Sequence, residues 1–424
     1  MRERKVIREG KSICDSCGRV VPSGEVYRQG FTYWEKFCPH EGKNFSRLLN
    51  RGRWYPSPRP LSFAPHFRVK LGSIFQGELD KVENIERIET FVLRITDLCD
   101  AGCQVCVDYH KIGRKEPGIR ELSRMELFSH RHIALTGGEP TLREDLEEII
   151  RYLKKKRNFV SICTNGLKLA EEERVRRLKE SGLDQVLLSF DGFQEKSYEM
   201  LWGGRKNLYL KLKALDNLKK ISLPVILQVT LVKGINFSEI GKILELARED
   251  FIGGVWFKPL HLYTNLGSNF NLTHLPTLKE IRKEIIRKTG IKEDYFDILY
   301  EFKLRMLNLR EEIFPGLPLS QPQSNQLFLD KNLSPLLNRE ELLSFKKGNI
   351  FKGKSWLRIL MKRGFSYLGL EKELLKKTVR VVIGRSRSPY EINLDFPLPY
   401  LYLSYSQDKG WRFPLSPTHI TPMD

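Results

Sequence analysis

Long hydrophobic runs are missing from this chain of 424 residues. A membrane-spanning helix needs about 20 mostly apolar residues. The run LPVILQVTLV, at residues 223–232, has only the length of a buried strand. The charged opening MRERKVIREG lacks the apolar segment of a secretory signal. We therefore expect a cytoplasmic protein without membrane-spanning helices.

Cysteine is scarce, with seven residues in the whole chain, and the number is odd. A disulfide framework is typical of short secreted chains with many paired cysteines. Here the cysteines instead gather in close groups. We expect them to bind metal in a reducing cytosol.

Acidic residues are outnumbered, with Asp+Glu 52 against Lys+Arg 72 and a formal net charge of +20. This excess suits an anionic partner such as a nucleotide, a nucleic acid or a lipid headgroup. It equally suits the charged surface of a thermophilic protein. Charge alone does not choose between these interpretations, and we do not favour nucleic acid.

Composition and residue pattern divide the chain into four regions. Residues 1–55 contain CDSC and FCPHEG, which suggest a small cysteine-rich metal-binding module. Residues 56–87 begin with a proline-rich stretch that is unsuited to helix or central strand and is expected to be an extended linker. Residues 88–268 alternate regularly, and residues 269–424 look like an α+β region that covers the active site.

The alternation in residues 88–268 predicts the fold. Short β-branched runs are separated by charged amphipathic segments such as LREDLEEIIRYLKKK and AEEERVRRLKES. Six such repeats predict an α/β protein with a parallel sheet, here a partial (β/α)6 TIM-like barrel. Active sites of such sheets lie at the C-terminal ends of the strands. The predicted strands are ETFVLRIT, HIALTG, NFVSICT, DQVLLSF, PVILQVTLV and GGVWFKPL.

Three cysteines, Cys99, Cys103 and Cys106, follow the first predicted strand with the spacing C-x3-C-x2-C. Thiolates are ligands for zinc or for an iron–sulfur cluster. A closed zinc site needs a fourth ligand, and none of the candidates Asp97, Asp100, Asp108 and His110 would form a familiar zinc pattern. A four-iron cluster held by three cysteines would leave one iron open for another molecule.

The motifs that follow these cysteines carry a family resemblance. LTGGEPTLREDL ends the second predicted strand, CTNGLKLA the third and LLSFDGF the fourth. In this order, with the cysteine spacing, the chain resembles the radical S-adenosylmethionine (radical SAM) superfamily. The resemblance implies a 4Fe-4S cluster on the three cysteines and S-adenosylmethionine (SAM) bound at the open iron. It also implies a 5′-deoxyadenosyl radical that removes hydrogen from an unactivated C–H bond.

The resemblance also implies which residues bind SAM. Gly137, Gly138 and Glu139 would receive the methionine amino group. Ser189 would approach the cofactor, Thr164 and Asn165 would line the cavity, and Asp191 would touch the ribose or begin a turn. The residue before the last cysteine is commonly aromatic in the superfamily and stacks near adenine, whereas here it is Val105. The implied cofactor contacts are Val105, Gly137, Gly138, Glu139, Thr164, Asn165, Ser189 and Asp191.

Within the superfamily, residues 88–285 are similar to the archaeal tetraether-lipid synthase and methanopterin-methylating branch. The branch tends to carry C-terminal cysteines for an auxiliary cluster, but no cysteine follows Cys163 here. The reaction of the known relatives therefore does not transfer. Cys163 itself is best interpreted as a small core residue.

The N-terminal cysteines suggest a second metal site. Cys14, Cys17, Cys38 and His40 could hold zinc or iron in a small knuckle, and the alternative is thiols without a metal. A basic segment at 346–377, with interspersed large apolar residues, could lie on an anionic membrane, but a core-facing helix with a solvated basic side is favoured.

Lys258, His261 and Tyr263 follow or end the sixth predicted strand and are weak substrate-site candidates. The expected substrate is a lipid or a cofactor precursor. The alternatives are modification of RNA or a peptide by the same core, or a zinc-binding structural protein. The expected partner is a low-potential electron donor such as ferredoxin.

Overall fold

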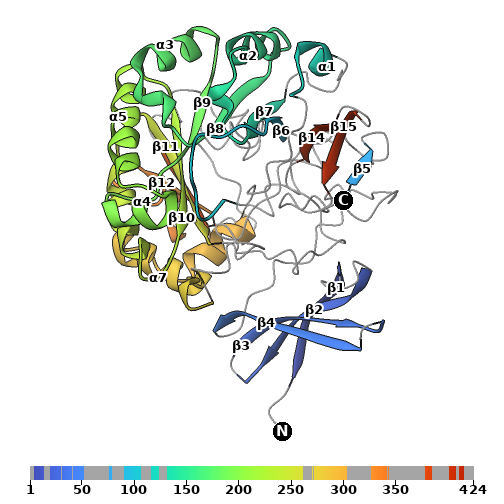
Figure 1. The fold of residues 1–424 in the computed structure, drawn as a ribbon. Helices are drawn as coiled ribbons and strands as arrows, with labels where there is room; N and C mark the ends of the chain where they lie inside the picture. Colours follow the sequence, from blue (N-terminus) through green and yellow to red (C-terminus); the bar gives the residue numbers. More distant parts are fainter. Residues whose placement is uncertain are drawn as a thin grey trace.

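Two sheets organise the part of the chain that the computed structural model describes (Figure 1). The described residues are 4–13, 20–29, 31–40, 42–51, 76–78, 90–106, 116–123, 131–260, 270, 272–302, 326–340, 342, 378–383, 401–406 and 410–414. One sheet is small and N-terminal, and the other is the core of the α/β region.

The N-terminal sheet is an antiparallel meander in the order β1-β2-β3-β4. Its strands are β1 (Lys5–Ile13), β2 (Val20–Arg28), β3 (Phe31–Cys38) and β4 (Lys43–Arg51). Strand β4 contacts α7 (Leu278–Thr289), so this sheet lies against the α/β region (Figure 1).

The large sheet contains 11 strands in the order β12-β13-β11-β10-β9-β8-β7-β6-β14-β15-β5. Its central six strands are β6 (Thr90–Thr96), β7 (His132–Gly137), β8 (Phe159–Thr164), β9 (Gln185–Ser189), β10 (Val225–Leu231) and β11 (Ile252–Pro259). They are parallel and follow the order of the chain. The predicted α/β fold is confirmed, and each predicted strand agrees with an observed one to within one or two residues.

The C-terminal part of the chain extends this sheet at both edges. Strand β13 (Thr378–Ile383) runs parallel to β11, and β14 (Leu401–Ser406) runs parallel to β6. Strand β12 (Gln326–Asp330) pairs with β13, and β15 (Gly410–Pro414) joins β14 to β5 (Gln76–Glu78). Segments far apart in the sequence thus form the two edges of one sheet.

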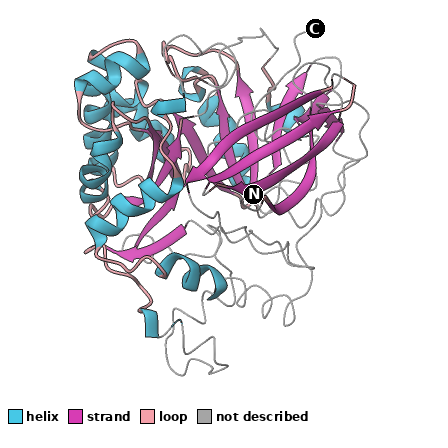
Figure 2. Cartoon of the chain, turned by 90° about the horizontal axis from the view of Figure 1, so that it is seen from below, coloured by secondary structure: helices cyan, strands magenta, loops and turns pink. Residues whose placement is uncertain are grey.

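Helices cover the outer face of the sheet (Figures 1 and 2). They are α1 (Ile119–Ser123), α2 (Leu146–Lys155), α3 (Glu172–Glu180), α4 (Glu195–Trp202), α5 (Lys206–Lys220), α6 (Ile240–Leu246) and α7. Short 3-10 helices are η3 (Pro140–Leu142), η4 (Lys168–Ala170), η5 (Phe237–Glu239) and η7 (Leu272–His274). Residues 295–302 are also helical. Among the described residues, no helix is both long and apolar enough to cross a membrane.

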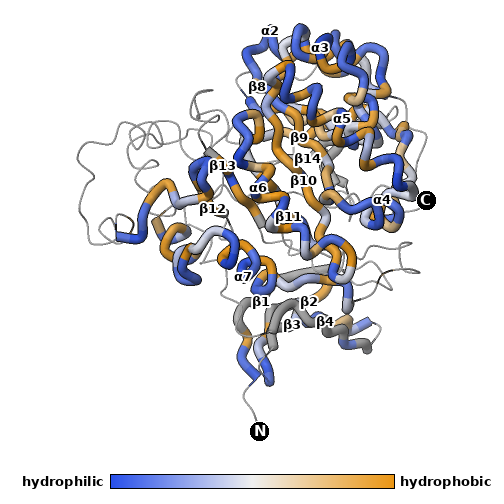
Figure 3. Tube along the Cα trace, turned by 90° about the vertical axis from the view of Figure 1, so that its left-hand side faces the viewer, coloured by the Kyte–Doolittle hydropathy of each residue, from blue (hydrophilic) through white to orange (hydrophobic). Residues whose placement is uncertain are grey.

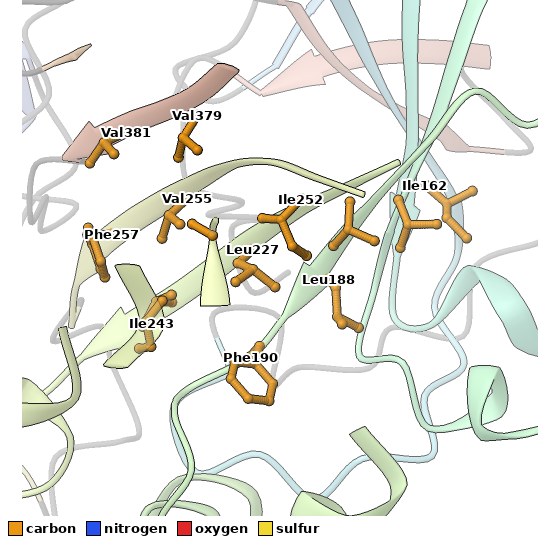
Figure 4. Close-up of a cluster of buried hydrophobic side chains, with 14 of the residues drawn as sticks. Ile162, Leu188, Phe190, Leu227, Ile243, Ile252, Val255, Phe257, Val379 and Val381 are labelled. Carbon is orange, nitrogen blue, oxygen red and sulfur yellow. The ribbon is translucent and has the colours of Figure 1, made fainter. Parts of the chain in front are cut away.

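The outer face of the sheet forms the hydrophobic core. Alternate residues such as Leu188, Leu227 and Phe257 point toward the helices and are fully buried, and Ile243 of α6 packs against them (Figure 4). The hydropathy trace shows the same division, with apolar strands inside and polar helix surfaces outside (Figure 3). Burial of this face is the main stabilising contribution to the fold.

The inner face of the large sheet is concave, as a partial barrel requires. Arg380 on β13 acts electrostatically on His132 on β7, although four strands lie between β7 and β13 in the sheet. Lys258 on β11 acts in the same way on Cys163 on β8. Charges that influence one another across so many strands indicate a concave sheet rather than a flat one.

Several sequence predictions fall outside the described residues. These are most of the linker at 56–87, the basic segment at 346–377, and the candidate residues Cys14, Cys17, Asp108, His110, His261 and Tyr263.

Candidate active site

The cysteine loop, residues 97–106, leaves the C-terminal end of β6 and is anchored at its start by the next strand. The amide of Gly138 donates to the carbonyl of Thr96 (2.8 Å), and that of Glu139 donates to the carbonyl of Leu98 (2.6 Å). A Cβ at Gly138 would lie 2.1 Å from the Leu98 oxygen. Gly137 has φ +146 and a Cβ there would meet the Thr96 oxygen. Both glycines are therefore required by the close approach of the loop backbone.

The loop has two further anchors. Asn165 Nδ2 donates to Asp100 Oδ1 (2.8 Å), and the amide of Gln104 donates to the carbonyl of Leu201 at the end of α4 (2.9 Å). Val105 and Cys103 pack against a second hydrophobic cluster that contains Trp202. The loop is thus fixed between β6, β8 and α4.

Cys99, Cys103 and Cys106 all keep partly accessible side chains. Burial raises the pKa of the Cys103 thiol, Lys211 lowers it, and Cys106 and Cys99 raise it further. The three sulfurs are therefore close enough to interact. Yet no three Cys, His, Asp or Glu side chains in the described ranges lie close enough together to hold a single metal ion. Three thiolates from one loop are a ligand set that holds an iron–sulfur cluster.

Glu139 is fully buried next to this loop. Its Oε1 accepts hydrogen bonds from the Thr141 amide (3.0 Å), Thr141 Oγ1 (2.6 Å) and Thr164 Oγ1 (2.7 Å). Its Oε2 accepts one, from the Asn165 amide (2.6 Å). Burial raises the pKa of the Glu139 carboxyl, and these hydrogen bonds partly offset the rise. The carboxylate is held rigidly, and Oε2 retains a lone pair that can receive a cation.

Lys211 is a buried cation that the sequence prediction did not include. It lies on α5, and its Nζ donates to the carbonyl of Ser189 at the end of β9 (2.6 Å). The ammonium sits 3.3 Å from the centroid of the Trp202 ring. Burial lowers the pKa of Lys211 to about 8, while Asp191, Cys103 and Glu139 raise it. No carboxylate pairs with Lys211 at salt-bridge distance in the described part of the chain.

Asp191 is buried and interacts electrostatically with this lysine. Its carboxylate accepts from Trp202 Nε1 (2.7 Å) and the Thr230 amide (2.6 Å), and its carbonyl accepts from Asn236 Nδ2 (3.1 Å). Burial raises the pKa of Asp191, and Lys211 lowers it. Asp191 thereby joins the ends of β9, α4 and β10. Its predicted ribose contact remains a prediction.

The remaining predicted residues lie as follows. Ser189 ends β9 and offers its carbonyl to Lys211. Thr164 and Asn165 support Glu139 from the end of β8. Lys258 on β11 donates to Gln228 Oε1 (3.0 Å). In the N-terminal sheet, Cys38 is buried at the end of β3, whereas His40 is exposed in the turn that follows.

Comparison with known proteins agrees with this geometry. Residues 93–247 match the family described as the radical SAM superfamily. These residues form a radical SAM domain. The expectation of a radical SAM enzyme core is therefore confirmed at the level of this domain, which contains the cysteine loop, Glu139 and Lys211.

Relatives with this domain differ in their named activities. A 7,8-dihydro-6-hydroxymethylpterin dimethyltransferase from Methanocaldococcus jannaschii is 28% identical over 308 residues, which cover 68% of this chain and 60% of that protein. A probable GTP 3′,8-cyclase from Pyrococcus abyssi is 33% identical over 163 residues, which cover 37% of this chain and 51% of that protein. Streptococcus suis SuiB bound to S-adenosylmethionine aligns with a TM-score of 0.41 at 16% identity, covering 48% of each chain. The chain thus spans 60% and 51% of the lengths of the two curated relatives.

Proposed function

We propose that this chain is a radical SAM enzyme that acts on a C–H bond of a small cofactor precursor. The bound cluster and SAM would together supply a 5′-deoxyadenosyl radical. Cys99, Cys103 and Cys106 would ligate three irons, because the described residues provide no fourth thiolate at this loop. A low-potential electron donor such as ferredoxin would serve as reductant.

The observation that carries the proposal is a pair of buried, opposite charges beside the cysteine loop. SAM presents an ammonium and a carboxylate at its methionine end. Glu139 Oε2 accepts a single hydrogen bond and could accept another from the ammonium, and Lys211 has no carboxylate partner of its own within the described ranges. A buried cation and anion that are not paired with each other are costly unless a ligand completes them. The SAM zwitterion would complete both at once.

Other residues would position this site rather than react. Thr164 and Asn165 fix the Glu139 carboxylate, and Trp202 and Asp191 flank the Lys211 ammonium. Val105 lies against the second hydrophobic cluster, where an aliphatic side chain could still contact adenine. Exclusion of water by these buried groups would protect a reactive radical.

A cofactor precursor is the favoured substrate class. The methanogen relative is named for a pterin, and the cyclases are named for GTP. Both are small, polar, heterocyclic molecules. A lipid substrate, which the sequence alone left open, has no corresponding support among these relatives.

Anaerobic reconstitution tests the proposal directly. Wild-type protein loaded with iron and sulfide, then given dithionite and SAM, should form 5′-deoxyadenosine, and Cys103→Ala should form none. Lys213→Met, on the exposed side of α5, is the matched control and should behave like wild type. Binding of one zinc per loop without any product in the wild type would refute the proposal.

For the N-terminal module we propose a separate structural metal site. Ile13 and Val20 pair at one end of the sheet, and Val21 and Cys38 lie at that same end, because Ser23 pairs with Lys36. In the sequence, the CDSC motif lies between Ile13 and Val20, the two described residues at this end of the sheet. Metal analysis should find one zinc or mononuclear iron that is lost in Cys38→Ser and retained in Cys163→Ser. Equal metal in both variants would contradict this site.

A further inference from the structure

The inner face of the barrel sheet differs in solvent accessibility between the two ends of its strands. Toward the C-terminal ends, the inward-pointing side chains remain partly accessible to solvent, although their neighbours in sequence are buried against the helices. Nearer the N-terminal ends of β7, β9, β10 and β11, both faces are buried. The accessible inward-pointing residues at the C-terminal ends of β7–β11 are Thr136, Cys163, Ser189, Gln228, Thr230, Trp256 and Lys258. We call this inner face, buried at its base and accessible beside the cysteine loop, the cup.

The wall of this cup is polar. Cys163 and Trp256 are its least polar members, and Trp256 Nε1 is a buried donor with no acceptor in the described structure. An alkyl chain in the cup would strip water from these groups and return no hydrogen bonds, which costs free energy for each group. The wall thus disfavours a lipid chain and favours a polar molecule.

Lys258 gives the cup its positive charge. Its Nζ donates to the neutral amide of Gln228 (3.0 Å) and lies 4.4 Å from the centroid of the Trp256 ring. Burial lowers the pKa of Lys258, while Cys163 and Asp191 raise it. No carboxylate forms a salt bridge with Lys258 in the described ranges, and Asp191 already accepts hydrogen bonds at both of its oxygens. An ammonium held only by an amide and an aromatic face still lacks an anion.

This cation is separate from the one assigned to SAM. Lys211 approaches from α5 and reaches the end of β9, next to Cys103 and Glu139. Lys258 comes from β11 and contacts side chains of β10 and β11. SAM carries one carboxylate, so a second unpaired lysine calls for a second anion.

We propose that Lys258, whose ammonium is held by Gln228 and Trp256, binds an oxyanion group of a small water-soluble substrate. This group is a phosphate or a carboxylate. The inference rests on the proposed function, because only a substrate has to enter the cup beside SAM. It deepens that function by naming the group that orients the substrate. A charge-assisted hydrogen bond from the ammonium to this oxyanion would hold the substrate in place. It would thereby fix the distance between the reacting carbon of the substrate and the end of the cup beside the cysteine loop.

The test measures anion binding to the cluster-loaded, SAM-bound protein by anaerobic calorimetry, with inorganic phosphate, pyrophosphate and acetate as probes. The wild type should bind at least one of them saturably. Lys258→Met should weaken that binding by about tenfold or more, since hydrogen bonds to charged groups are worth about 1.5–3 kcal/mol. Lys258→Arg should retain most of the affinity, and Lys213→Met should match the wild type.

Two measurements keep the outcome interpretable. Iron content and SAM affinity of Lys258→Met should equal those of the wild type, which shows that the variant is folded. If Lys258→Met does not fold, Gln228→Ala takes its place, because it removes the acceptor that holds the ammonium and should weaken anion binding less severely.

Several results would overturn the proposal. These are equal anion affinity in the wild type and Lys258→Met, a loss of SAM affinity that parallels the loss of anion affinity, or the absence of saturable binding of any probe. Lys258-dependent binding of phosphatidylglycerol vesicles in place of soluble anions would assign the site to a lipid. Lys258-dependent anion binding in a wild type that forms no 5′-deoxyadenosine would instead refute the proposed function and leave this anion site standing.

Discussion

The two faces of the strands β6–β11 are built from adjacent residues and yet differ in almost every property. On the outer face, Leu188, Leu227 and Phe257 are apolar and fully buried against helices (Figure 4). On the inner face, Ser189, Gln228 and Lys258 are polar and partly accessible. Because side chains alternate along a strand, one residue separates the part of the sheet that stabilises the fold from the part that can bind ligands.

The charges of the molecule differ in the same way. On the helix surfaces, lysine and arginine pair with carboxylates, as Arg176 and Lys220 do with Glu172. Such exposed pairs contribute little to stability. The two lysines that face the site, Lys211 and Lys258, are held by a carbonyl, an amide and aromatic rings. We therefore expect anions to bind at these two lysines, which lack a salt-bridge partner in the described part of the chain, rather than at the paired charges of the helix surfaces.

The largest effect is expected at the glycine that lets the cysteine loop approach β7. Gly138→Ala would place a Cβ 2.1 Å from the Leu98 oxygen, so the backbone that leads to Cys99 must move. We expect the variant to lose its iron–sulfur cluster. Iron content and the visible absorption after reconstitution measure this loss.

The control for Gly138→Ala is Gly234→Ala. Gly234 has a left-handed backbone, with φ +76, and nothing lies within 4 Å of its added Cβ. Gly234→Ala should cost about 1–2 kcal/mol of stability and leave the iron content unchanged. A fully loaded Gly138→Ala protein would show that the close approach is not needed.

A pair of adjacent substitutions tests the contrast between the faces. Leu227→Ala removes a fully buried side chain from the outer face and should lower the free energy of unfolding by about 2–5 kcal/mol. Gln228→Ala, on the inner face, should lower it by less than about 1 kcal/mol. Urea unfolding of the cluster-free proteins under reducing conditions measures both. Equal losses would mean that the inner face is packed as tightly as the outer face.

Much of this architecture could be predicted from the sequence because its signals are local. The runs at 132–137 and 225–231 are short, β-branched and bounded by turns, and both form the predicted strands. The order of the motifs likewise predicted that Cys99 and Glu139 follow two successive strands, and in the structure these are the neighbours β6 and β7. Local patterns are enough where each strand is followed by its own helix.

The pairing of distant segments was not predictable in this way. Nothing in the residues around 378–383 or 401–406 states that they join opposite edges of the barrel sheet. Lys211 was missed for a different reason, since it is one of several lysines in KNLYLKLKALDNLKK. A helical projection could have found it, because Lys211 lies in the buried stripe with Leu208, Leu215 and Leu218. A lysine within an apolar stripe indicates a buried charge, and a buried charge needs a partner.

Removal of that lysine's charge should reduce cofactor affinity without unfolding the protein. Lys211→Met keeps the aliphatic stem but loses the ammonium, and we expect SAM to bind about 10- to 100-fold more weakly, as for a lost charged hydrogen bond. Anaerobic equilibrium binding to cluster-loaded protein measures the change. Lys213→Met, two residues further along α5 and exposed, should leave the affinity unaltered. If both variants bind SAM equally well, Lys211 serves only to fix the Ser189 carbonyl.

The smallest effect concerns the base of the cup and depends on pH. Burial, reinforced by Arg380, lowers the pKa of His132 to about 3, from 6.5 in the unfolded chain. The folded protein therefore binds fewer protons than the unfolded protein between these values, and stability should fall as pH falls below 6.5. The expected slope from this residue is about 1.4 kcal/mol per pH unit.

His132→Gln isolates that contribution. The amide can keep a hydrogen bond to Ser161 Oγ, which His132 Nε2 contacts at 2.8 Å, but it cannot take up a proton. Urea unfolding of the variant at pH 7 and pH 5 should therefore show a shallower loss of stability than the wild type, by about 2 kcal/mol over the interval from 6.5 to 5. His274→Gln, in the partly exposed η7, is the matched control. A wild-type slope that persists in His132→Gln would assign the acid sensitivity to other groups, and the base of the cup would then be more open to water than its buried side chains indicate.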